Sequence, residues 1–550
     1  MENYVYKINK DKGSKLTQNP NILFIMVDQM KASILKIYSE IGIECPQIEK
    51  LATEGVMFEN AITPSPLCVP ARTSIMTGKY PHTTGCRRNE TLLPENENHA
   101  FKIWKDANYT TGLIGKNHCY MEKSDLDLFD VRLEISHQGL PKGGYIGTNP
   151  GTKGMDWGVK EELIDKANIN RLEMSKTKNK ICYSSSDKDE SLFSTSLISE
   201  RSVKFLEKYK QGEFSEEKKP FALWVSFPDP HEPYEAPKRY TDMFPPSGVK
   251  LPPQKENEFN DDLSPQRNRI LYEIMGHKSE PLNKIRAQIS VYQAMCKFID
   301  DGIKKIIEKL EELDLKENTI IVFTSDHGDF MGEHGMFVKG GVFYDCLVKV
   351  PLIISWPKGD FKKGVKEKSV VSTIDIIPTL FNLQGLVDFK ETGLGWKKNN
   401  ELKKDFLSEE TIRGFQGNLL PSVTKSEPKN IAFSEYGAGG PKFGFEDFKQ
   451  FKPPYGYRTL LETLWAREAE GRRKMVRTDK WKYITDSSED IDELYDLLKD
   501  PWELNNLSKN KDYDKTIEDM KGLLLDWMIK TEDKNPVEIP KNIGRDFFKE

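Results

Sequence analysis

Cys68 has the surroundings that most clearly suggest chemistry, because it opens the run Cys68-Val69-Pro70-Ala71-Arg72. Proline is favoured in the first turn of a helix, where its missing N–H costs nothing, so the run predicts a helix that begins at the cysteine. Free N–H groups and the positive end of the helix dipole favour an anion at such a position. Most cysteines in a chain of this size are small buried hydrophobic residues, but this one lies where a reactive group would be useful.

Charged and polar side chains follow four short apolar runs that are rich in β-forming residues. The runs are Asn21–Val27, Tyr109–Ile114, Phe221–Phe227 and Thr319–Thr324. The residues that follow them are Asp28-Gln29, Lys116-Asn117-His118, Asp229-Pro230-His231 and Asp326-His327. Because ligands bind at the carboxyl ends of the strands in open α/β sheets, we expect these side chains to converge at one sheet edge.

Convergence of these residue types would suit the cleavage of a sulfate or phosphate ester. That reaction needs a nucleophile, positive charge on the non-bridging oxygens and a proton for the leaving oxygen. A divalent cation can hold the nucleophile and absorb charge, and Asp28 and Asp326 are ligands of the type that a hard cation prefers. Taken singly, an aspartate after a strand is more often a turn residue, so the hypothesis depends on the whole set.

These segments together resemble the type I sulfatases, a formylglycine-dependent family of the alkaline phosphatase-like superfamily. The run from Cys68 to Arg72 is similar to the family signature C-x-P-x-R, which residues 73–82 continue. Three further segments match the family patterns D-H-G…G-E-H-G…K, G-K-x-H and P-H-x-P-Y; they are residues 326–339, 115–118 and 230–234. The resemblance extends from about Pro20 to Leu507.

The resemblance implies a mechanism in which a separate formylglycine-generating maturation enzyme oxidises Cys68 to an aldehyde. One hydroxyl of the hydrated aldehyde attacks sulfur, and the other later expels sulfate. The catalytic residues that the resemblance assigns beside Cys68 are Arg72, Lys116, His118, His231 and Lys339. Arg72 would hold the formylglycine, Lys116 and His118 would contact the nucleophile and the sulfate, and His118 or a nearby base would remove the second proton.

The resemblance also gives roles at the leaving-group end of the reaction. His231 would touch the ester oxygens or protonate the leaving group, and Lys339 would balance the charge that develops on the leaving oxygen. The implied partner is a small sulfated substrate, and a sugar sulfate, choline sulfate and an aryl sulfate all stay open.

The implied metal ligands are Asp28, Gln29, Asp326 and His327, with the modified Cys68 completing the set. Many sulfatases have aspartate where Gln29 stands and asparagine where His327 stands. The exchange makes the site less anionic and adds a nitrogen ligand, so calcium is the first expectation and manganese or magnesium stays open. These two positions also keep open an alternative function, a phosphonate monoester or phosphodiester hydrolase that uses the same site.

Composition excludes several other classes of protein. The chain has 550 residues, of which 37% are hydrophobic and 30% charged, as expected for a globular protein with a charged surface. Its 81 basic and 86 acidic residues give a net charge of -5, which offers no electrostatic reason to bind nucleic acid. The apolar run Ile22–Val27 is far below the ~20 residues that span a bilayer, so we expect no membrane segment and no signal peptide.

The seven cysteines are scattered and include no C-x-x-C pair, which predicts neither a disulfide framework nor a structural zinc site. We therefore expect a reduced, cytoplasmic protein, with a periplasmic or secreted location still open.

The fold expected from the alternation of β-rich runs and amphipathic stretches is α/β, with a large mixed, mostly parallel sheet flanked by helices. We expect three parts: an N-terminal arm over residues 1–19, a catalytic domain over residues 20–400 and a small C-terminal α+β subdomain over residues 425–550. The polar, irregular stretch Gly385–Asn430 contains the predicted boundary. Helices are expected over Ser290–Leu313 and Thr516–Ile529, and a strand–turn–strand unit over Lys474–Ile484.

One cluster in the C-terminal part has two open interpretations. Its aromatic and basic residues could shape the substrate pocket or form a domain interface, and the second interpretation is slightly favoured. The members are Tyr455, Tyr457, Arg458, Trp465, Arg467, Arg472 and Arg473.

Overall fold

The structure is a computed structural model of the whole chain. It describes residues 4–8, 19–95, 97–137, 139–140, 152–174, 176–215, 219–259, 262–391, 411–412, 415–489 and 491–532.

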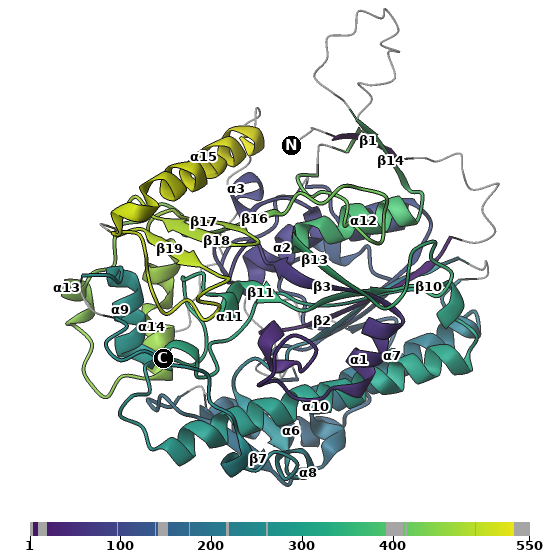
Figure 1. Cartoon of the computed structure of the whole chain (residues 1–550). Coiled ribbons are helices and arrows are strands. Elements are labelled where there is room, and N and C mark those ends of the chain that lie inside the picture. The colour runs from purple at the N-terminus through teal and green to yellow at the C-terminus, as the bar shows by residue number, and fades with distance from the viewer. Residues whose placement is uncertain are drawn as a thin grey trace, which may run out of the picture.

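A ten-stranded sheet forms the centre of the molecule (Figure 1). Its strand order is β11-β3-β12-β10-β2-β8-β4-β5-β6, and β13 (Val365–Ser372) pairs with β3 (Gly55–Ile62). The outer strands of this order are β11 (Lys349–Val350), β12 (Leu352–Ser355), β5 (Val131–Glu134) and β6 (Thr152–Lys153). The strands that carry the four predicted runs are β2 (Asn21–Val27), β4 (Thr110–Gly115), β8 (Phe221–Phe227) and β10 (Thr319–Ser325). They are mutually parallel neighbours and fully buried, as near-continuous apolar runs predict for the middle of an α/β sheet.

Helices cover both faces of this sheet. Alternate residues of β2 enter opposite hydrophobic cores, because side chains along a strand point to opposite faces: Leu23 and Ile25 enter one, Ile22 and Phe24 the other. The first core is closed by α1 (Pro46–Thr53), α7 (Ser194–Lys210) and α10 (Leu282–Glu312). The second is closed by α2 (Cys68–Thr77), α4 (Ala100–Asp106) and α12 (Ile376–Leu383). The expected α/β fold is confirmed.

The C-terminal part forms a separate small antiparallel sheet with a helix against it (Figure 1). Its strands are β16 (Ile431–Tyr436), β17 (Arg473–Thr478), β18 (Trp481–Thr485) and β19 (Glu493–Asp496). Helix α15 (Asp514–Thr531) places Trp527 against Phe433 of the sheet. The predicted strand–turn–strand unit and final helix are therefore confirmed, whereas the three domain boundaries stay predictions.

Two predicted elements differ from the structure. Helix α10 begins at Leu282, eight residues before the predicted Ser290, because Pro281 precedes it and can start a helix. Within the predicted arm, Tyr4–Ile8 forms strand β1, which pairs with β14 (Val387–Glu391) and β15 (Thr411–Ile412). The β-branched and aromatic residues of β1 favour a strand; residues 9–18 of the arm and 392–410 of the boundary stretch lie outside the described residues.

No helix in the described part of the chain is both long and apolar enough to cross a membrane. All seven cysteines are described, and each is a free thiol. The cellular compartment stays a prediction.

Candidate active site

Cys68 is the first residue of α2, as the sequence predicts, and its side chain is buried. The preceding Leu67 is extended, with φ -130° and ψ 144°, so the chain turns into the helix at the cysteine. Gly78 ends the helix in the left-handed conformation, with φ 64°, which glycine adopts without strain. The helix thus presents its N-terminal residue to the carboxyl edge of the main sheet.

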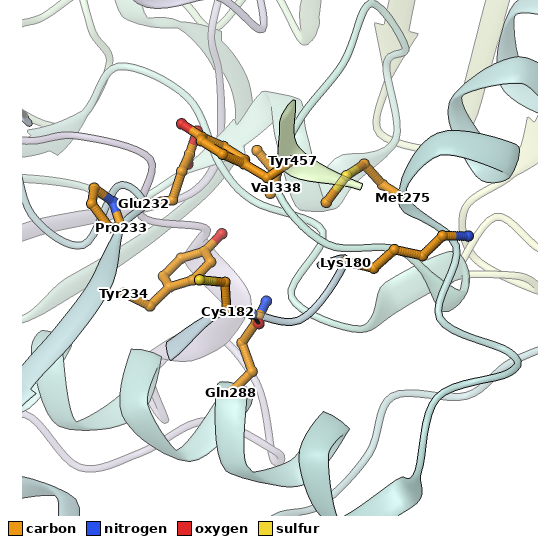
Figure 2. A pocket seen from close by; sticks show the side chains of 9 residues that line it. All are labelled: Lys180, Cys182, Glu232, Pro233, Tyr234, Met275, Gln288, Val338 and Tyr457. Carbon is orange, nitrogen blue, oxygen red and sulfur yellow. Dashed lines mark hydrogen bonds between the residues drawn. The ribbon is translucent and has the colours of Figure 1, made fainter. Parts of the chain in front are cut away.

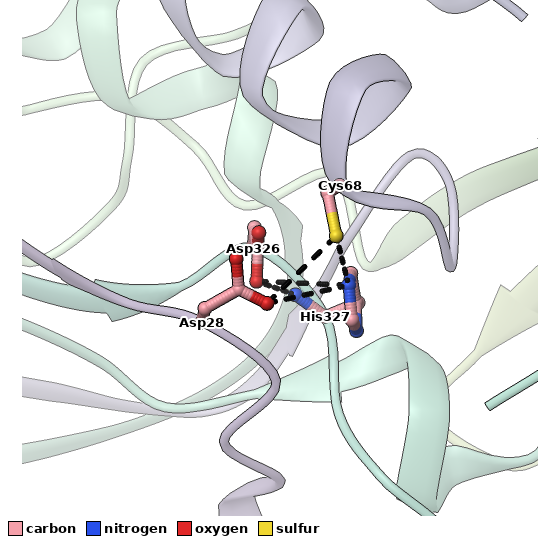
Figure 3. Close-up of side chains that lie close together, drawn as sticks. All are labelled: Asp28, Cys68, Asp326 and His327. Carbon is pink, nitrogen blue, oxygen red and sulfur yellow. Dashed lines mark hydrogen bonds and ion pairs between the residues drawn. The ribbon is translucent and has the colours of Figure 1, made fainter. Parts of the chain in front are cut away.

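The side chains that follow three different strands surround the Cys68 sulfur. Its Sγ atom lies 3.2 Å from Nε2 of His327 and 3.8 Å from Oδ1 of Asp28 (Figure 3). The Nζ atoms of Lys116 and Lys339 each lie 3.5 Å from the same sulfur. These residues are up to 311 positions apart in the sequence, and the parallel strands bring them together.

Arg72, one turn along α2 from Cys68, joins the two aspartates of the site. Its Nε donates to Oδ2 of Asp326 at 2.8 Å and its Nη2 donates to Oδ2 of Asp28 at 3.0 Å. The Nη1 atom donates to the Ser226 hydroxyl at 2.8 Å, and Lys116 donates to Asp28 as well. The planar guanidinium can bind both carboxylates at once, which a lysine ammonium could not do with the same geometry.

The charges of this cluster shift the pKa of its carboxylate and thiol groups in opposite directions. Burial acts to raise the pKa of Asp28, but the positive charges of Lys116, Arg72 and Lys339 outweigh it and hold that pKa well below its usual range. Burial, reinforced by the Asp28 charge, raises the pKa of the Cys68 thiol to about 11. Unmodified Cys68 is therefore protonated at neutral pH and is a weak nucleophile.

The donor set beside Cys68 fits a divalent cation. Ligand atoms of Asp28, Cys68, Asp326 and His327 all lie within 4.8 Å of one another, and all four residues are buried. Nδ1 of His327 lies 2.9 Å from the carbonyl oxygen of Gly328 and donates to it, so Nε2 presents its lone pair to the site. Carboxylate oxygens with an imidazole nitrogen suit calcium, magnesium or manganese.

Gln29 lies beside this set, but its side chain makes other contacts. Its amide Nε2 donates to Glu232 at 2.7 Å and to Asp329 at 2.6 Å, and its Oε1 accepts from Lys339 at 2.6 Å. Gln29 itself has a positive φ of 65°, and its backbone N–H donates to Asp326 at 3.0 Å. A metal-ligand role for Gln29 stays a prediction.

The two predicted catalytic histidines, His118 and His231, lie near Lys116 and Lys339 respectively. Nε2 of His231 is 2.7 Å from Nζ of Lys339, and its Nδ1 is 2.6 Å from the carbonyl oxygen of Glu232. Burial and the Lys339 charge lower the pKa of His231 well below its usual value. Burial and the Lys116 charge do the same for the pKa of His118, so both imidazoles are neutral at pH 7.

Like Arg72 and His231, His118 makes no hydrogen bond to the Cys68 side chain among the described residues. Its Nδ1 is buried and makes no hydrogen bond in that part of the chain. Its ring stands edge-on to His137 at 5.7 Å between centroids, and His137 stacks on His231 at 4.6 Å. Sequence reasoning missed His137; its position just after β5 (Val131–Glu134), the neighbour of β4, is the signal that could have identified it.

The members of the C-terminal aromatic and basic cluster lie in different surroundings, some near the site and some at the interface between the two parts of the molecule. The Tyr457 hydroxyl donates to Oε1 of Glu232 at 3.3 Å, so this residue reaches the neighbourhood of the site. Arg473 is buried and binds Glu493 and Asn268 between the two parts of the molecule. Trp465 is 61% exposed.

Known proteins match this chain over most of its length. The family model described as Sulfatase matches residues 20–386. The ulvan-active sulfatase of Formosa agariphila is 30% identical over 394 residues, which are 68% of this chain and 65% of that protein; the matched chain thus spans just under two thirds of that relative. The arylsulfatase of Clostridium perfringens is 29% identical over 518 residues, which cover 92% of this chain and 94% of that protein.

Solved structures share the fold over nearly the whole chain. The phosphonate monoester hydrolase of Agrobacterium radiobacter superposes with a TM-score of 0.69 at 21% identity, covering 94% of this chain and 96% of that one. BT1596, a 2-O GAG sulfatase, superposes with a TM-score of 0.62 at 21% identity, covering 94% and 93%. The chain belongs to the sulfatase family, whose members are sulfuric ester hydrolases of the alkaline phosphatase-like superfamily.

Proposed function

We propose that this chain hydrolyses the sulfate ester of a small sugar, choline or aryl substrate through a formylglycine derived from Cys68. The observation that carries the proposal is the position of the Cys68 sulfur, within 3.8 Å of a carboxylate, an imidazole and two lysine ammonium groups. A formylglycine at this position, made by a separate maturation enzyme, would supply a hydroxyl that attacks sulfur.

The proposed metal ligands are Asp28, Asp326, His327 and the modified residue 68, with Gln29 as a further candidate. A divalent cation held there would neutralise charge at the nucleophile. We take calcium as the first candidate because two carboxylates suit a hard cation, with manganese and magnesium next because an imidazole nitrogen is present.

Lys116 is the proposed binding group for the sulfate, and Lys339 is proposed to balance the charge that develops on the leaving oxygen. Both ammonium groups lie 3.5 Å from the Cys68 sulfur, and the Cys68 side chain is buried. Positive charge aimed at a reacting anion stabilises the transition state most strongly where water is excluded. Arg72 binds both Asp28 and Asp326 and fixes their positions. A neutral His118 would accept the proton that the second hydroxyl loses.

His231 and Lys339 are the proposed proton source for the leaving oxygen. Because the Nδ1–H of His231 donates to the carbonyl of Glu232, its Nε2 accepts from the Lys339 ammonium. The pair therefore shares a proton close to the Cys68 sulfur, and either group can pass it to the departing alcohol.

A phosphonate monoester or phosphodiester hydrolase is the second candidate function, because Gln29 and His327 depart from the commonest sulfatase residues. To decide, the chain should be produced with a formylglycine-generating enzyme, and the tryptic peptide that contains residue 68 analysed by mass spectrometry. The matured protein is then assayed with 4-nitrophenyl sulfate and with 4-nitrophenyl phenylphosphonate. We expect the aldehyde and a higher kcat/KM for the sulfate, whereas a higher value for the phosphonate would support the second candidate. Aldehyde-bearing protein that turns over neither of these aryl esters, nor choline sulfate, nor any of a panel of sugar monosulfates would refute both.

A further inference from the structure

Lys339 lies on a loop whose backbone is strained. This Lys339 loop, residues 337–344, contains neither helix nor strand. Val338, directly before the lysine, has a φ of 69°, which is a rare conformation for a β-branched residue. Such strain persists where the surrounding structure fixes the backbone, and it is common at functional sites. Contacts from outside the loop must therefore hold Lys339 in its position.

Packing of side chains fixes only part of this loop. Gly340 lies against Leu271, and a Cβ added to the glycine would clash with the leucine side chain. Val338, by contrast, borders a small space that Glu232 and Tyr457 also line (Figure 2). The strained end of the loop is thus not closely packed on every side.

Arg473 of β17 binds the loop from the C-terminal sheet. Its side chain is 1% exposed, and its Nη1 donates at 3.2 Å to the carbonyl oxygen of Gly341, which follows Lys339 by two residues. Nη1 also donates to Oδ1 of Asn268 at 3.0 Å, and Nη2 pairs with Glu493. Asn268 in turn donates to Glu493 at 3.0 Å. The three side chains form a closed ring of hydrogen bonds that fixes the guanidinium.

The position of this guanidinium leaves one of its donors unpaired. Nε of Arg473 makes no hydrogen bond in the described part of the chain, and a buried donor without an acceptor costs stability. Arg477 of the same strand instead binds Asp345 with both Nε and Nη2, at 3.3 and 3.1 Å. Arg477 thus joins the two parts of the molecule through a carboxylate, whereas Arg473 holds the backbone beside Lys339.

The contacts of the Lys339 side chain depend on where this backbone lies. Its Nζ is 3.5 Å from the Cys68 sulfur, 2.7 Å from Nε2 of His231 and 2.6 Å from Oε1 of Gln29. A displacement of about 1 Å in a group that acts on the reacting atoms can lower a rate about 10²-fold. A contact that fixes the Gly341 carbonyl therefore bears on the reaction.

We propose that Arg473 is a positioning residue, which holds the Lys339 loop through the Gly341 carbonyl and so keeps the Lys339 ammonium beside the leaving oxygen. The C-terminal sheet thereby affects the reaction without touching the substrate. The inference rests on the proposed function, in which Lys339 balances the charge that develops on that oxygen. Loss of the Arg473 contact should slow the departure of poor leaving groups more than that of good ones.

Two aryl sulfates test this expectation in the matured protein, because 4-nitrophenol is a better leaving group than phenol. Arg473→Lys keeps the positive charge but lacks the planar fork that binds several acceptors at once. We expect it to lower kcat/KM for phenyl sulfate about tenfold more than for 4-nitrophenyl sulfate, which is part of the roughly 10²–10⁴-fold effect of a positioned proton donor.

A second variant carries the test if Arg473→Lys does not fold. Asn268→Ser removes one acceptor of Nη1 and leaves the ion pair between Arg473 and Glu493. It should give a smaller selective loss, about threefold, as expected for one hydrogen bond.

Arg477→Lys is the matched control, since Arg477 is a buried arginine of the same strand that binds Asp345. It should change the rates with the two aryl sulfates by the same factor. If Arg473→Lys and Asn268→Ser also change both rates by one factor, Arg473 has only a structural role and the proposal is wrong.

A double-mutant cycle shows whether Arg473 acts through Lys339, and it can use any ester that the protein hydrolyses. In the Lys339→Met background, Arg473→Lys should lower the rate by less than about twofold, because the ammonium that Arg473 positions is absent. An equal loss in the presence and absence of Lys339 would contradict the proposal.

Hydrogen exchange separates this inference from the proposed function. The Phe330 N–H donates to the carbonyl oxygen of Val338 at 2.9 Å, so its exchange reports whether the loop is held. We expect exchange to be about tenfold faster in Arg473→Lys than in Arg477→Lys, and equal rates would overturn the proposal. If the matured protein hydrolyses no sulfate ester, the proposed function fails, and faster exchange would still assign the loop contact to Arg473. If it hydrolyses both aryl sulfates without the selective loss, the function stands and the positioning role fails.

Discussion

Two buried clusters of charged side chains differ in how their charges balance. The interface cluster consists of Asp345, Arg477, Lys482 and Glu503, and it joins the start of α11 (Asp345–Val348) to the C-terminal sheet. Lys482 lies 2.6 Å from Asp345 and 2.5 Å from Glu503, and Arg477 lies 3.1 Å from Asp345. Two cations thus face two carboxylates.

The cluster around Cys68 is not balanced in this way. Three cations, Arg72, Lys116 and Lys339, contact the sulfur or the two carboxylates of Asp28 and Asp326. The next carboxyls, Glu232 and Asp329, bind the Gln29 amide, and burial raises the pKa of both. An unmatched charge in a buried site is costly unless a ligand offsets it. The comparison teaches that buried charges are arranged in two ways here: matched charges join two parts of the protein, whereas the three cations around Cys68 are proposed to bind an anion.

The largest expected effect comes from removing the atom at the centre of the unbalanced cluster. In Cys68→Ala we expect hydrolysis of 4-nitrophenyl sulfate to fall by about 10⁴-fold or more, as loss of a catalytic nucleophile does elsewhere. The free energy of unfolding should change by no more than about 1 kcal/mol, because few atoms are removed. Initial rates and urea unfolding measure the two quantities.

Cys45→Ala is the control for that variant, since Cys45 is equally buried but precedes α1, away from the site. It should keep full hydrolysis while losing about 1 kcal/mol of stability. An active Cys68→Ala protein would refute the proposed mechanism.

Removal of divalent cations should have the next largest effect. We expect EDTA to lower hydrolysis by about 10²–10³-fold, the range for losing one charge-stabilising group, and added calcium, manganese or magnesium to restore it. A cation that binds the native state alone also raises the midpoint of thermal unfolding. Asp326→Asn should abolish that rise and Asp345→Asn should keep it; full activity after chelation would argue against a metal.

Removing one lysine from each cluster tests the comparison directly. Lys482→Met leaves Asp345 and Glu503 without a shared cation, so we expect the protein to lose about 3–5 kcal/mol of stability. Lys339→Met removes a surplus cation, so we expect a loss of only about 1–2 kcal/mol, mainly from the Gln29 carbonyl that loses its donor. Its hydrolysis rate should fall about 10²–10³-fold.

Urea unfolding measures the loss of stability in each of the two lysine variants. Initial rates of Lys339→Met measure its loss of hydrolysis. Equal destabilisation by both substitutions would show that the site around Cys68 is as balanced as the interface cluster.

The smallest expected effect is a change in the pH dependence of stability at the interface cluster. Burial raises the pKa of Glu503 to about 7, against the lowering effect of Lys482. The folded chain therefore holds this proton more tightly than the unfolded chain, whose glutamates titrate near 4.3. The contribution of Glu503 to stability is present below that lower pKa and is lost as the pH rises towards about 7.

Glu503→Gln should remove this slope, which amounts to at most about 1.4 kcal/mol per pH unit for one proton. The free energy of unfolding of both proteins, measured between pH 5 and pH 8, provides the test. Parallel curves for wild type and variant would show that Glu503 has an ordinary pKa.

Several features of the site could be predicted from short stretches of sequence because their causes are local. A proline two residues after Cys68 starts a helix there, and apolar runs such as Asn21–Val27 form buried strands. The resemblance to the sulfatase family, confirmed by the family model, is carried by the same short stretches. Their catalytic and metal-binding roles stay predictions.

Other features depend on contacts between distant segments. His137 reaches His231 only because β5 lies beside β4, and Tyr457 reaches Glu232 across 225 residues of sequence.

By itself, the sequence determined the family, the α/β class of fold, the start of the motif helix and the polar ends of the central strands. Only the tertiary structure decided which charges are matched, which are in surplus and which buried donor lacks an acceptor. The reason is physical: helix starts and strand runs follow from neighbouring residues, whereas charge balance and hydrogen-bond satisfaction depend on every group that shares the same buried volume.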